Sequence, residues 1–201
     1  MRTRCTTLVA LALVVLALGA CSVSTTSSES DDGTPLDDGP TDLLHERGAA
    51  ARAIAAIEEK VGASPARAGE ILVYPEHMDV EAQDPAITEH IDEFEWRDDS
   101  VTGPTPVALS GPQEDVEASL FPTSTVRWRD IPDVVAEVEA RARRAKPLRI
   151  EQAKASYLIV QRSTSSEDDG RVEISIYLNG PRRSGNAELT ASGEIINLTV
   201  N

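Results

Sequence analysis

The residue types best suited to bind a metal ion gather between positions 76 and 99. On an extended strand His77, Asp79 and Glu81 would point to one face, and His90 lies on the segment that follows. Imidazole and carboxylate groups together suit a divalent cation, so these four residues are a candidate metal site. Their spacing matches no dedicated metal-binding motif, and a strand face that is polar because it is exposed is the alternative interpretation.

The same stretch contains ten carboxylates and one arginine. Paired carboxylates can act as general acid and base, but no apolar residues are placed here to raise the pKa of one of them. A solvated acidic surface that meets a basic partner is therefore favoured. The chain has no Gly-x-Ser-x-Gly, no His-Glu-x-x-His, no phosphate-binding glycine loop and no cysteine pair for a metal. We predict a non-catalytic protein without a cofactor, with an enzyme or cation-binding protein using residues 76–99 as the alternative.

Another reactive group is the thiol of Cys21, which ends an apolar segment. Arg2 and Arg4 precede the apolar run 8–20, a layout typical of a secretory signal peptide. The run is shorter than the roughly 20 residues that a spanning helix needs. Cys5, the other of the two cysteines, would leave with the signal, so the mature chain could form no internal disulfide. The alternatives are an uncleaved membrane helix and a secreted protein with a free Cys21.

The residues Leu18-Gly19-Ala20-Cys21 resemble a bacterial lipobox. The resemblance implies cleavage between Ala20 and Cys21 and a diacylglycerol on the Cys21 sulfur, with a further acyl chain such as palmitate on the new amino terminus. Two or more acyl chains anchor a protein stably, whereas one does not. The expected location is therefore the extracytoplasmic face of the cell membrane, with residues 1–20 removed as a signal peptide.

The charge of the chain limits its partners. There are 34 acidic against 19 basic residues, for a formal net charge of −15, so phosphate backbones repel the surface and nucleic-acid binding is excluded. Residues 21–40 are rich in Ser, Thr, Asp and Gly and have almost no apolar content. They are expected to be a disordered acidic tether, with a root-mean-square span of roughly 25 Å.

Hydrophobic periodicity then predicts a helix, several strands, a second helix and several further strands. The expected helices are 50–61 and 131–145, and the expected strands are 71–75, 77–83, 91–98, 107–110, 156–162, 171–179, 187–190 and 194–200. The two sets match in order at offsets of about 81 to 86 residues, as in a duplicated module. In this alignment 94–97 matches 174–177, and 107–111 matches 189–193. Coincidence among common α+β patterns is the alternative.

The predicted fold class is α+β. We expect two tandem modules, 41–125 and 126–201, each with one helix packed on an antiparallel β-meander of three to four strands. A helix followed by a meander with a late Gly193-Glu194-Ile195 resembles the PepSY or beta-lactamase-inhibitor-protein type of small extracytoplasmic module. The resemblance covers residues 126–201 and implies a binding, inhibitory or regulatory role toward an unknown envelope protein or polymer.

Four residues are candidates for contacting that partner. Trp96 and Trp128 are the two indoles, and each either belongs to the core or faces a ligand. Arg141 and Arg144 lie in a basic cluster at the end of the second helix. The cluster is either a partner-binding patch or a set of charges that complements the helix dipole and pairs with acidic residues one turn earlier.

Overall fold

A computed structural model describes residues 41–109, 112–163 and 170–201 of the 201-residue chain. All of them belong to one compact unit, 39–201. The predicted signal peptide, its cleavage at Ala20 and Cys21, and the tether 21–40 lie outside the described residues. Within the described ranges no helix is long and apolar enough to cross a membrane.

The described elements alternate between helices and runs of antiparallel strands. In chain order they are α1 (Ala49–Val61), β1 (Arg67–Val73), β2 (His77–Gln83), β3 (Ile91–Arg97), β4 (Ser100–Pro106), α2 (Gln113–Ser119), β5 (Phe121–Pro122), the 3-10 helices η1 (Thr123–Thr125) and η2 (Trp128–Asp130), α3 (Ile131–Arg144), β6 (Lys154–Arg162), β7 (Val172–Asn179), β8 (Ser184–Thr190) and β9 (Ile195–Val200).

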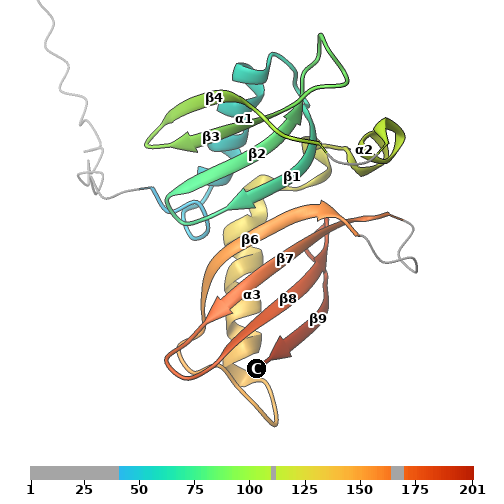
Figure 1. Cartoon of the computed structure of the whole chain (residues 1–201). Helices are drawn as coiled ribbons and strands as arrows, with labels where there is room; N and C mark the ends of the chain where they lie inside the picture. The colour runs from blue at the N-terminus through green and yellow to red at the C-terminus, as the bar shows by residue number, and fades with distance from the viewer. Residues whose placement is uncertain (1–40, 110–111, 164–169) are drawn as a thin grey trace, which may run out of the picture. The chain divides into compact units, whose positions relative to one another are not determined.

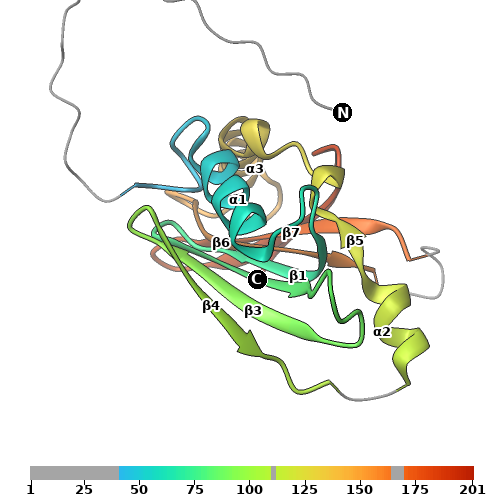
Figure 2. The same ribbon diagram turned by 90° about the horizontal axis from the view of Figure 1, so that it is seen from above.

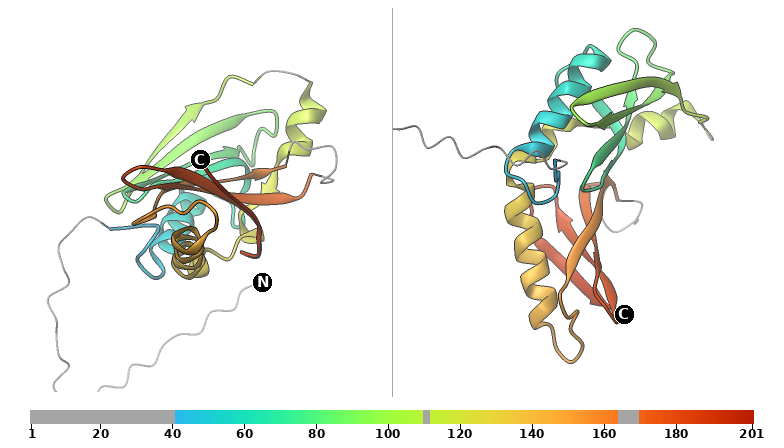
Figure 3. Two further views of the ribbon diagram at one scale, coloured as in Figure 1. Left: turned by 90° about the horizontal axis from the view of Figure 1, so that it is seen from below. Right: turned by 90° about the vertical axis from the view of Figure 1, so that its left-hand side faces the viewer.

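The strands form a single antiparallel sheet in the order β4-β3-β2-β1-β6-β7-β8-β9, with the short β5 also paired to β1 (Figure 1). At its centre β1 pairs with β6, and Ile71 lies opposite Val160. Both long helices, α1 and α3, lie on the same face of the sheet (Figures 2 and 3). The predicted mixed α+β class with antiparallel strands is confirmed.

A helix followed by four strands occurs twice, as α1 with β1–β4 and as α3 with β6–β9. The two sets share one continuous sheet, so the description as two tandem modules is not confirmed and the boundaries 41–125 and 126–201 stay predictions. The detailed repeat alignment is wrong. It matched residues 94–97 in β3, the third strand of the first set, with residues 174–177 in β7, the second strand of its set. Every half-buried strand has the same period of two, so the pattern cannot say which strand is which.

Each long helix buries one stripe of small and branched apolar residues. In α1 the buried positions Ala50, Ala53, Ile54 and Ile57 follow helical spacing. Gly62 ends the helix with φ of 83°, and its N–H donates to the Glu58 carbonyl oxygen, the arrangement that glycine permits at low cost. Helix α3 begins with proline in its first turn, buries Ile131, Val135, Val138 and Ala142, and packs against β6, β7 and β9.

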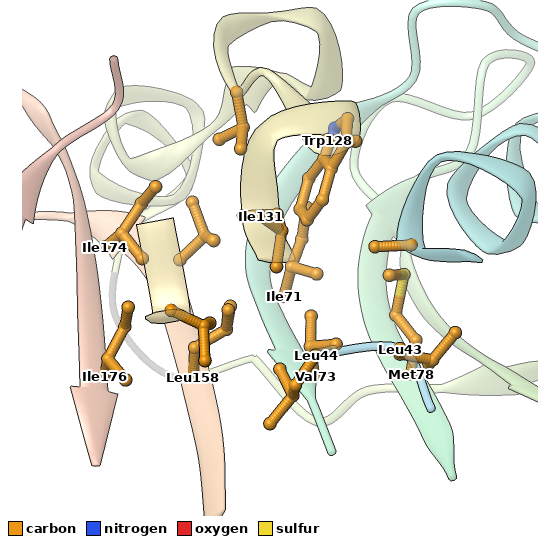
Figure 4. Packing of buried hydrophobic residues seen from close by; sticks show 14 of the residues in the cluster. Leu43, Leu44, Ile71, Val73, Met78, Trp128, Ile131, Leu158, Ile174 and Ile176 are labelled. Carbon is orange, nitrogen blue, oxygen red and sulfur yellow. The ribbon is translucent and has the colours of Figure 1, made fainter. Parts of the chain in front are cut away.

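These stripes meet the inward side chains of the sheet in one hydrophobic cluster (Figure 4). The cluster runs from Met78 in β2, through Ile71 in β1 and Leu158 in β6, to Ile176 in β7, all of them fully buried. Burying one such side chain stabilises the fold by about 1.5 to 3 kcal/mol. Because residues 39–201 contain this whole core, they are able to fold without the preceding segment.

One expected strand segment is wrong. The strand predicted at 107–110 is instead β4, Ser100–Pro106, which follows β3 after a tight turn; Ser110 itself lies outside the described residues. Gly103 has φ of 108°, and a Cβ there would lie 2.7 Å from the Glu93 carbonyl oxygen, so the bulged pairing of β4 requires glycine. Trp128 itself lies in the 3-10 helix η2.

Candidate functional site

The sheet face opposite α1 and α3, here called the open face, is lined by the partly exposed side chains that alternate with the core residues. Strands β2 and β7 show this alternation over almost their whole length. In the described part of the chain the only helix beside this face is α2. It lies at one end of the face, where Glu117 accepts hydrogen bonds from Arg67 (2.9 Å) and Gln83 (2.6 Å). Among the described helices, none covers the rest of the open face.

Four aromatic rings cross the middle of the open face. Tyr177 stacks on Tyr157 with ring centroids 4.4 Å apart, Tyr157 stacks on Tyr74 at 5.4 Å, and Tyr74 stacks on His77 at 4.3 Å. These include all three tyrosines of the chain. We call this set the aromatic row. Stacked rings gain about 0.5 to 1.5 kcal/mol per pair beyond their burial, so the row is a rigid, partly exposed apolar strip.

Strand pairing builds the row from residues far apart in the sequence. Tyr157 in β6 lies directly opposite Tyr177 in β7. Tyr74 follows Val73, which pairs with Leu158, so its ring reaches the Tyr157 ring. The N–H of Tyr74 donates to the His77 carbonyl oxygen at 2.9 Å across the β1–β2 turn. No motif links positions 74, 157 and 177, and only the register of β1, β6 and β7 brings them together.

Beside the aromatic row, carboxylates of β1–β3 face one another. Glu70 lies directly opposite Glu81, and Glu81 directly opposite Glu93. Asp79 and Glu95 form the next opposed pair. We call these five residues the acidic face. Within the described residues Glu70, Glu81 and Glu93 have no ion-pair partner, whereas Glu95 contacts Arg97 at 2.7 Å. Like charges directly opposite each other destabilise a sheet, so this surface costs stability.

The pKa values on the acidic face reflect this crowding. Burial raises the pKa of Glu81, and the charges of Glu70 and Glu93 raise it further. Burial also raises the pKa of Asp79, with Glu95 and Glu93 adding to the increase and the His77 imidazole opposing it. A cation placed over these groups would relieve the repulsion. With the aromatic row alongside, the open face suits ammonium and guanidinium groups, which both carboxylates and aromatic faces attract.

The four residues of the predicted metal site are not brought together. His77 starts β2, whereas His90 precedes β3, and the antiparallel pairing puts His90 beside Asp84 at the far end of the hairpin. At about 3.4 Å per residue the strand separates the two histidines by roughly 20 Å. No group of three or more His, Cys, Asp or Glu side chains in the described ranges is arranged to hold a metal ion.

His77 has a different environment from the one predicted. Its side chain is 18% exposed, its ring stacks on Tyr74, and its Nε2 lies 3.7 Å from an Asp79 oxygen. The ring Nδ1 atom is buried and has no hydrogen-bond partner in the described part of the chain. Asp79 and Glu81 belong to the acidic face. Three of the four predicted metal ligands thus lie on the open face, but as parts of an aromatic and acidic surface.

The predicted partner-binding residues divide between core and surface. Trp96 is 2% exposed and Trp128 is 7% exposed, so neither indole faces a ligand. The Trp128 indole N–H donates to the Thr123 carbonyl oxygen at 2.9 Å, which satisfies its polar atom inside the core. Arg141 and Arg144 are both exposed, and Arg141 pairs with Glu137 at 2.7 Å, as the helical spacing predicted.

His45 connects the start of the described chain to α3. The His45 Nδ1 atom lies 3.0 Å from Asp42, and Nε2 lies 3.0 Å from Glu139. Glu139 is 11% exposed and also accepts a hydrogen bond from the N–H of Ala155 in β6. Burial opposes protonation of His45, but the hydrogen bonds to Glu139 and Asp42 outweigh it and raise its pKa. Nothing in the local sequence indicates this contact, because its partner lies 94 positions away.

Comparison with known proteins identifies a similar fold. The crystal structure of a protein described as "a putative lipoprotein" from Clostridium difficile 630 superposes with a TM-score of 0.52 at 9% identity. The match covers 79% of this chain and 97% of the other. At this identity the similarity shows the fold alone. No family model and no curated protein sequence matches the chain.

Proposed function

We propose that this chain is a lipid-anchored lipoprotein of the extracytoplasmic membrane face that binds a basic segment of an envelope protein without catalysing a reaction. The observation that carries the binding role is the open face. There Glu81 lies opposite both Glu70 and Glu93, none of the three has an ion-pair partner among the described residues, and the stacked aromatic row lies beside them. A lysine- or arginine-rich segment laid across β1–β3 would neutralise these carboxylates and contact the rings.

The anchor rests on separate support. The lipobox-like Leu18-Gly19-Ala20-Cys21 follows an apolar segment and a basic start, and residues 21–40 have the composition of a flexible tether. A similar fold in a protein described as "a putative lipoprotein" agrees with this assignment. The tether would hold the compact unit, 39–201, close to the membrane while leaving the open face accessible to neighbouring proteins.

The binding role can be tested with residues 39–201 and a labelled polylysine probe. The double variant Glu81→Gln/Glu93→Gln removes two unpaired carboxylates of the acidic face and should weaken binding about tenfold at low salt. Adding Tyr157→Ala to this variant breaks the aromatic row between Tyr74 and Tyr177 and should weaken polylysine binding further. Any polyglutamate binding should be the same in the wild type and in Glu81→Gln/Glu93→Gln, because the acidic face repels this probe.

The matched control is Glu59→Gln/Glu194→Gln, which removes the same charge from exposed positions outside the open face. Equal weakening by this control would mean that net charge alone attracts polylysine, and the open face would lose its assigned role. For the physiological partner, crosslinking on intact cells should capture a basic envelope protein with the wild type and lose it with Glu81→Gln/Glu93→Gln.

The anchor needs its own experiment, since it can fail while the binding role stands. Cells fed a labelled fatty acid should incorporate label into the wild-type chain and not into Cys21→Ser. The variant should also leave the membrane fraction. Equal labelling of both proteins, or none in the wild type, would overturn the anchor and leave the polylysine result unaffected.

A further inference from the structure

A second charged surface lies at the end of α3, away from the acidic face. The loop 145–153 follows the helix and lies beside the β7–β8 turn, at the end of the C-terminal half of the sheet (Figures 1 and 3). These segments and the last turn of α3 carry five exposed cations that we call the basic tip: Arg144, Lys146, Arg149, Arg182 and Arg183. In a chain with a net charge of −15, such a grouping is a local reversal of sign.

Packing holds the parts of the basic tip in place. Ile150 is fully buried, and its N–H donates to the Ala142 carbonyl oxygen at 3.0 Å, which ties the loop to the last turns of α3. The β7–β8 turn rests directly on this loop. A Cβ on Gly180 would lie 2.6 Å from both the Glu151 carbonyl oxygen and an Ile150 methyl group. This packing places the cations of the loop next to those of the turn.

Most of the positive charge of the tip is not neutralised within the described residues. Arg149 pairs with Glu151 at 3.2 Å, and both side chains are 64% exposed, so solvent weakens that pair. Arg144 interacts electrostatically with Glu137. Lys146, Arg182 and Arg183 have no ion-pair partner in the described ranges. A shallow hollow of about 500 Å³ lies between loop and turn, lined by Leu148, Arg149, Arg182 and Arg183 among others.

An exposed leucine lies among these cations. Leu148 is 41% exposed and lines the hollow, and its neighbours Pro147 and Arg149 line both the hollow and the surface of Arg144 and Lys146. A soluble anion would gain nothing from this leucine. A lipid bilayer offers anionic head groups to the cations and an apolar region to Leu148, as at other interfacial protein surfaces. The combination therefore favours a membrane as the occupant.

We propose that the basic tip docks on an anionic phospholipid surface, with Arg182 and Arg183 contacting head-group phosphates and Leu148 inserting between them. The proposal goes beyond partner binding at the open face and does not depend on it. Salt screens charges over about 8 Å, so the tip cations act on a nearby membrane with little opposition from the distant acidic face. Each cation close to an anionic surface strengthens binding roughly fivefold.

The start of the described chain lies within reach of the same membrane. His45 contacts Glu139 in the middle of α3, and the seven residues from there to Lys146 span about 10 Å. If Cys21 carries lipid, as proposed above, the tether enters the compact unit near the docking surface. A tether of the predicted span of roughly 25 Å would then allow the tip to reach the bilayer. Docking would hold the unit in one orientation instead of leaving it free on the tether.

The test is co-sedimentation of residues 39–201 with vesicles of phosphatidylcholine containing about one third phosphatidylglycerol. Because this fragment lacks Cys21, failure here is distinct from failure of the lipid anchor. The wild type should bind these vesicles and not pure phosphatidylcholine. Arg182→Gln/Arg183→Gln, two exposed positions without ion pairs, should weaken binding at least tenfold. The matched control Arg47→Gln/Arg129→Gln removes the same charge from exposed positions outside the tip and should bind like the wild type.

A third variant and a soluble polyanion distinguish the possible occupants. Leu148→Gln should weaken vesicle binding several-fold while leaving any binding of inorganic polyphosphate unchanged. Unchanged vesicle binding by Leu148→Gln, equal weakening by the control variant, or equal binding to both kinds of vesicle would overturn membrane docking. Binding of polyphosphate without binding of vesicles would also overturn it and would identify the tip as a site for soluble polyanions. A circular dichroism spectrum of each variant confirms that it is folded.

Discussion

The two halves of the sheet have the same layout and opposite treatment of their outward charges. In β1–β3 the carboxylates of Glu70, Glu81 and Glu93 face one another, with no ion-pair partner in the ranges that the structure describes. In β7 and β8 the corresponding outward carboxylates are bonded: Glu173 to Arg171 at 2.8 Å, and Glu188 to Asn197 at 3.5 Å. Three neighbouring carboxylates of the first half thus lack a bonded partner among the described residues, whereas Glu173 and Glu188 of the second half each have one. Function on this fold depends on the surface residues and not on the arrangement of helix and strands.

The halves also differ at their ends. The first half has α2 at one end of β1 and β2, where Glu117 bonds Arg67 and Gln83. The second half ends in the basic tip, which has a buried isoleucine beneath it and an exposed leucine at its surface. If both proposals hold, one half recognises a partner and the other recognises the membrane. The following predictions test how far the halves are distinct.

The largest expected effect comes from truncating a core side chain in either half of the sheet. Met78→Ala in β2 and Leu158→Ala in β6 each truncate a fully buried side chain and should each lower the free energy of unfolding by about 2 to 5 kcal/mol. Because one cluster spans both halves, each variant should show a single denaturant transition shifted as a whole. Two transitions, with only one moved by each substitution, would show that the halves are independent modules.

The next largest effect on the free energy of unfolding should come from removing the contact between His45 and Glu139. Glu139→Ala leaves the Ala155 N–H without its acceptor and should cost about 1 to 3 kcal/mol. The raised pKa of His45 also makes stability depend on pH. Its contribution is complete below the unfolded pKa of about 6.5 and is lost as the pH rises through the higher folded value. Unfolding followed from about pH 6 to about pH 9 should show this loss in the wild type and not in His45→Gln.

A smaller effect, of opposite sign in the two halves, should come from neutralising outward carboxylates. The folded pKa of Glu81 is raised, so its ionised form costs stability at neutral pH; that cost declines as the pH falls through the folded pKa and is gone below the unfolded pKa. Glu81→Gln should therefore stabilise the protein by about 0.2 to 1 kcal/mol, since solvent screens half-exposed carboxylates. Glu173→Gln, which breaks a pair with Arg171, should not stabilise it. Stabilisation by both, or by neither, would remove the contrast between the halves.

The smallest effect should come from a second link between the start of the chain and α3. Arg47 pairs with Asp133 at 2.8 Å, but the two side chains are 77% and 61% exposed. Arg47→Gln should change the free energy of unfolding by less than about 0.5 kcal/mol, because exposed ion pairs contribute little. Thermal unfolding beside Glu139→Ala measures the difference. A loss as large as that of Glu139→Ala would mean that the exposed pair holds the segment.

Several elements followed from local patterns alone. Helices α1 and α3 lie within one residue of their predicted ranges, 50–61 and 131–145, and β2 matches its predicted bounds of 77–83, because periods of 3.6 and 2 are properties of the backbone. The predicted bounds of β4, 107–110, were wrong because they depend on a contact with another strand. Gly103 and the bulge beside it place the strand before the apolar segment 107–109, and a bulge depends on the partner strand.

The candidate sites were only partly accessible to such reasoning. The acidic stretch 76–99 and the basic end of α3 were visible as charge patterns, and Asp79, Glu81 and Arg144 lie on the surfaces described here. The sequence could not place Trp96 and Trp128, because indoles are common both in cores and at binding sites. Both side chains are buried in the core. His77 was placed on the correct face, but its neighbour there is Tyr74 and not a second metal ligand.

By itself, the sequence determined the α+β class, the helix and strand faces and the sign of the charge along each segment, and it supplies the grounds for proposing an anchor at Cys21. Those properties depend on residues close together in the chain. The tertiary structure alone decided that both strand sets share one sheet, that Tyr74, Tyr157 and Tyr177 stack, and that Arg182 and Arg183 join the end of α3. Strand register and long-range packing set these contacts. The alternation of buried and exposed residues within one strand does not specify which strand it pairs with or in which register.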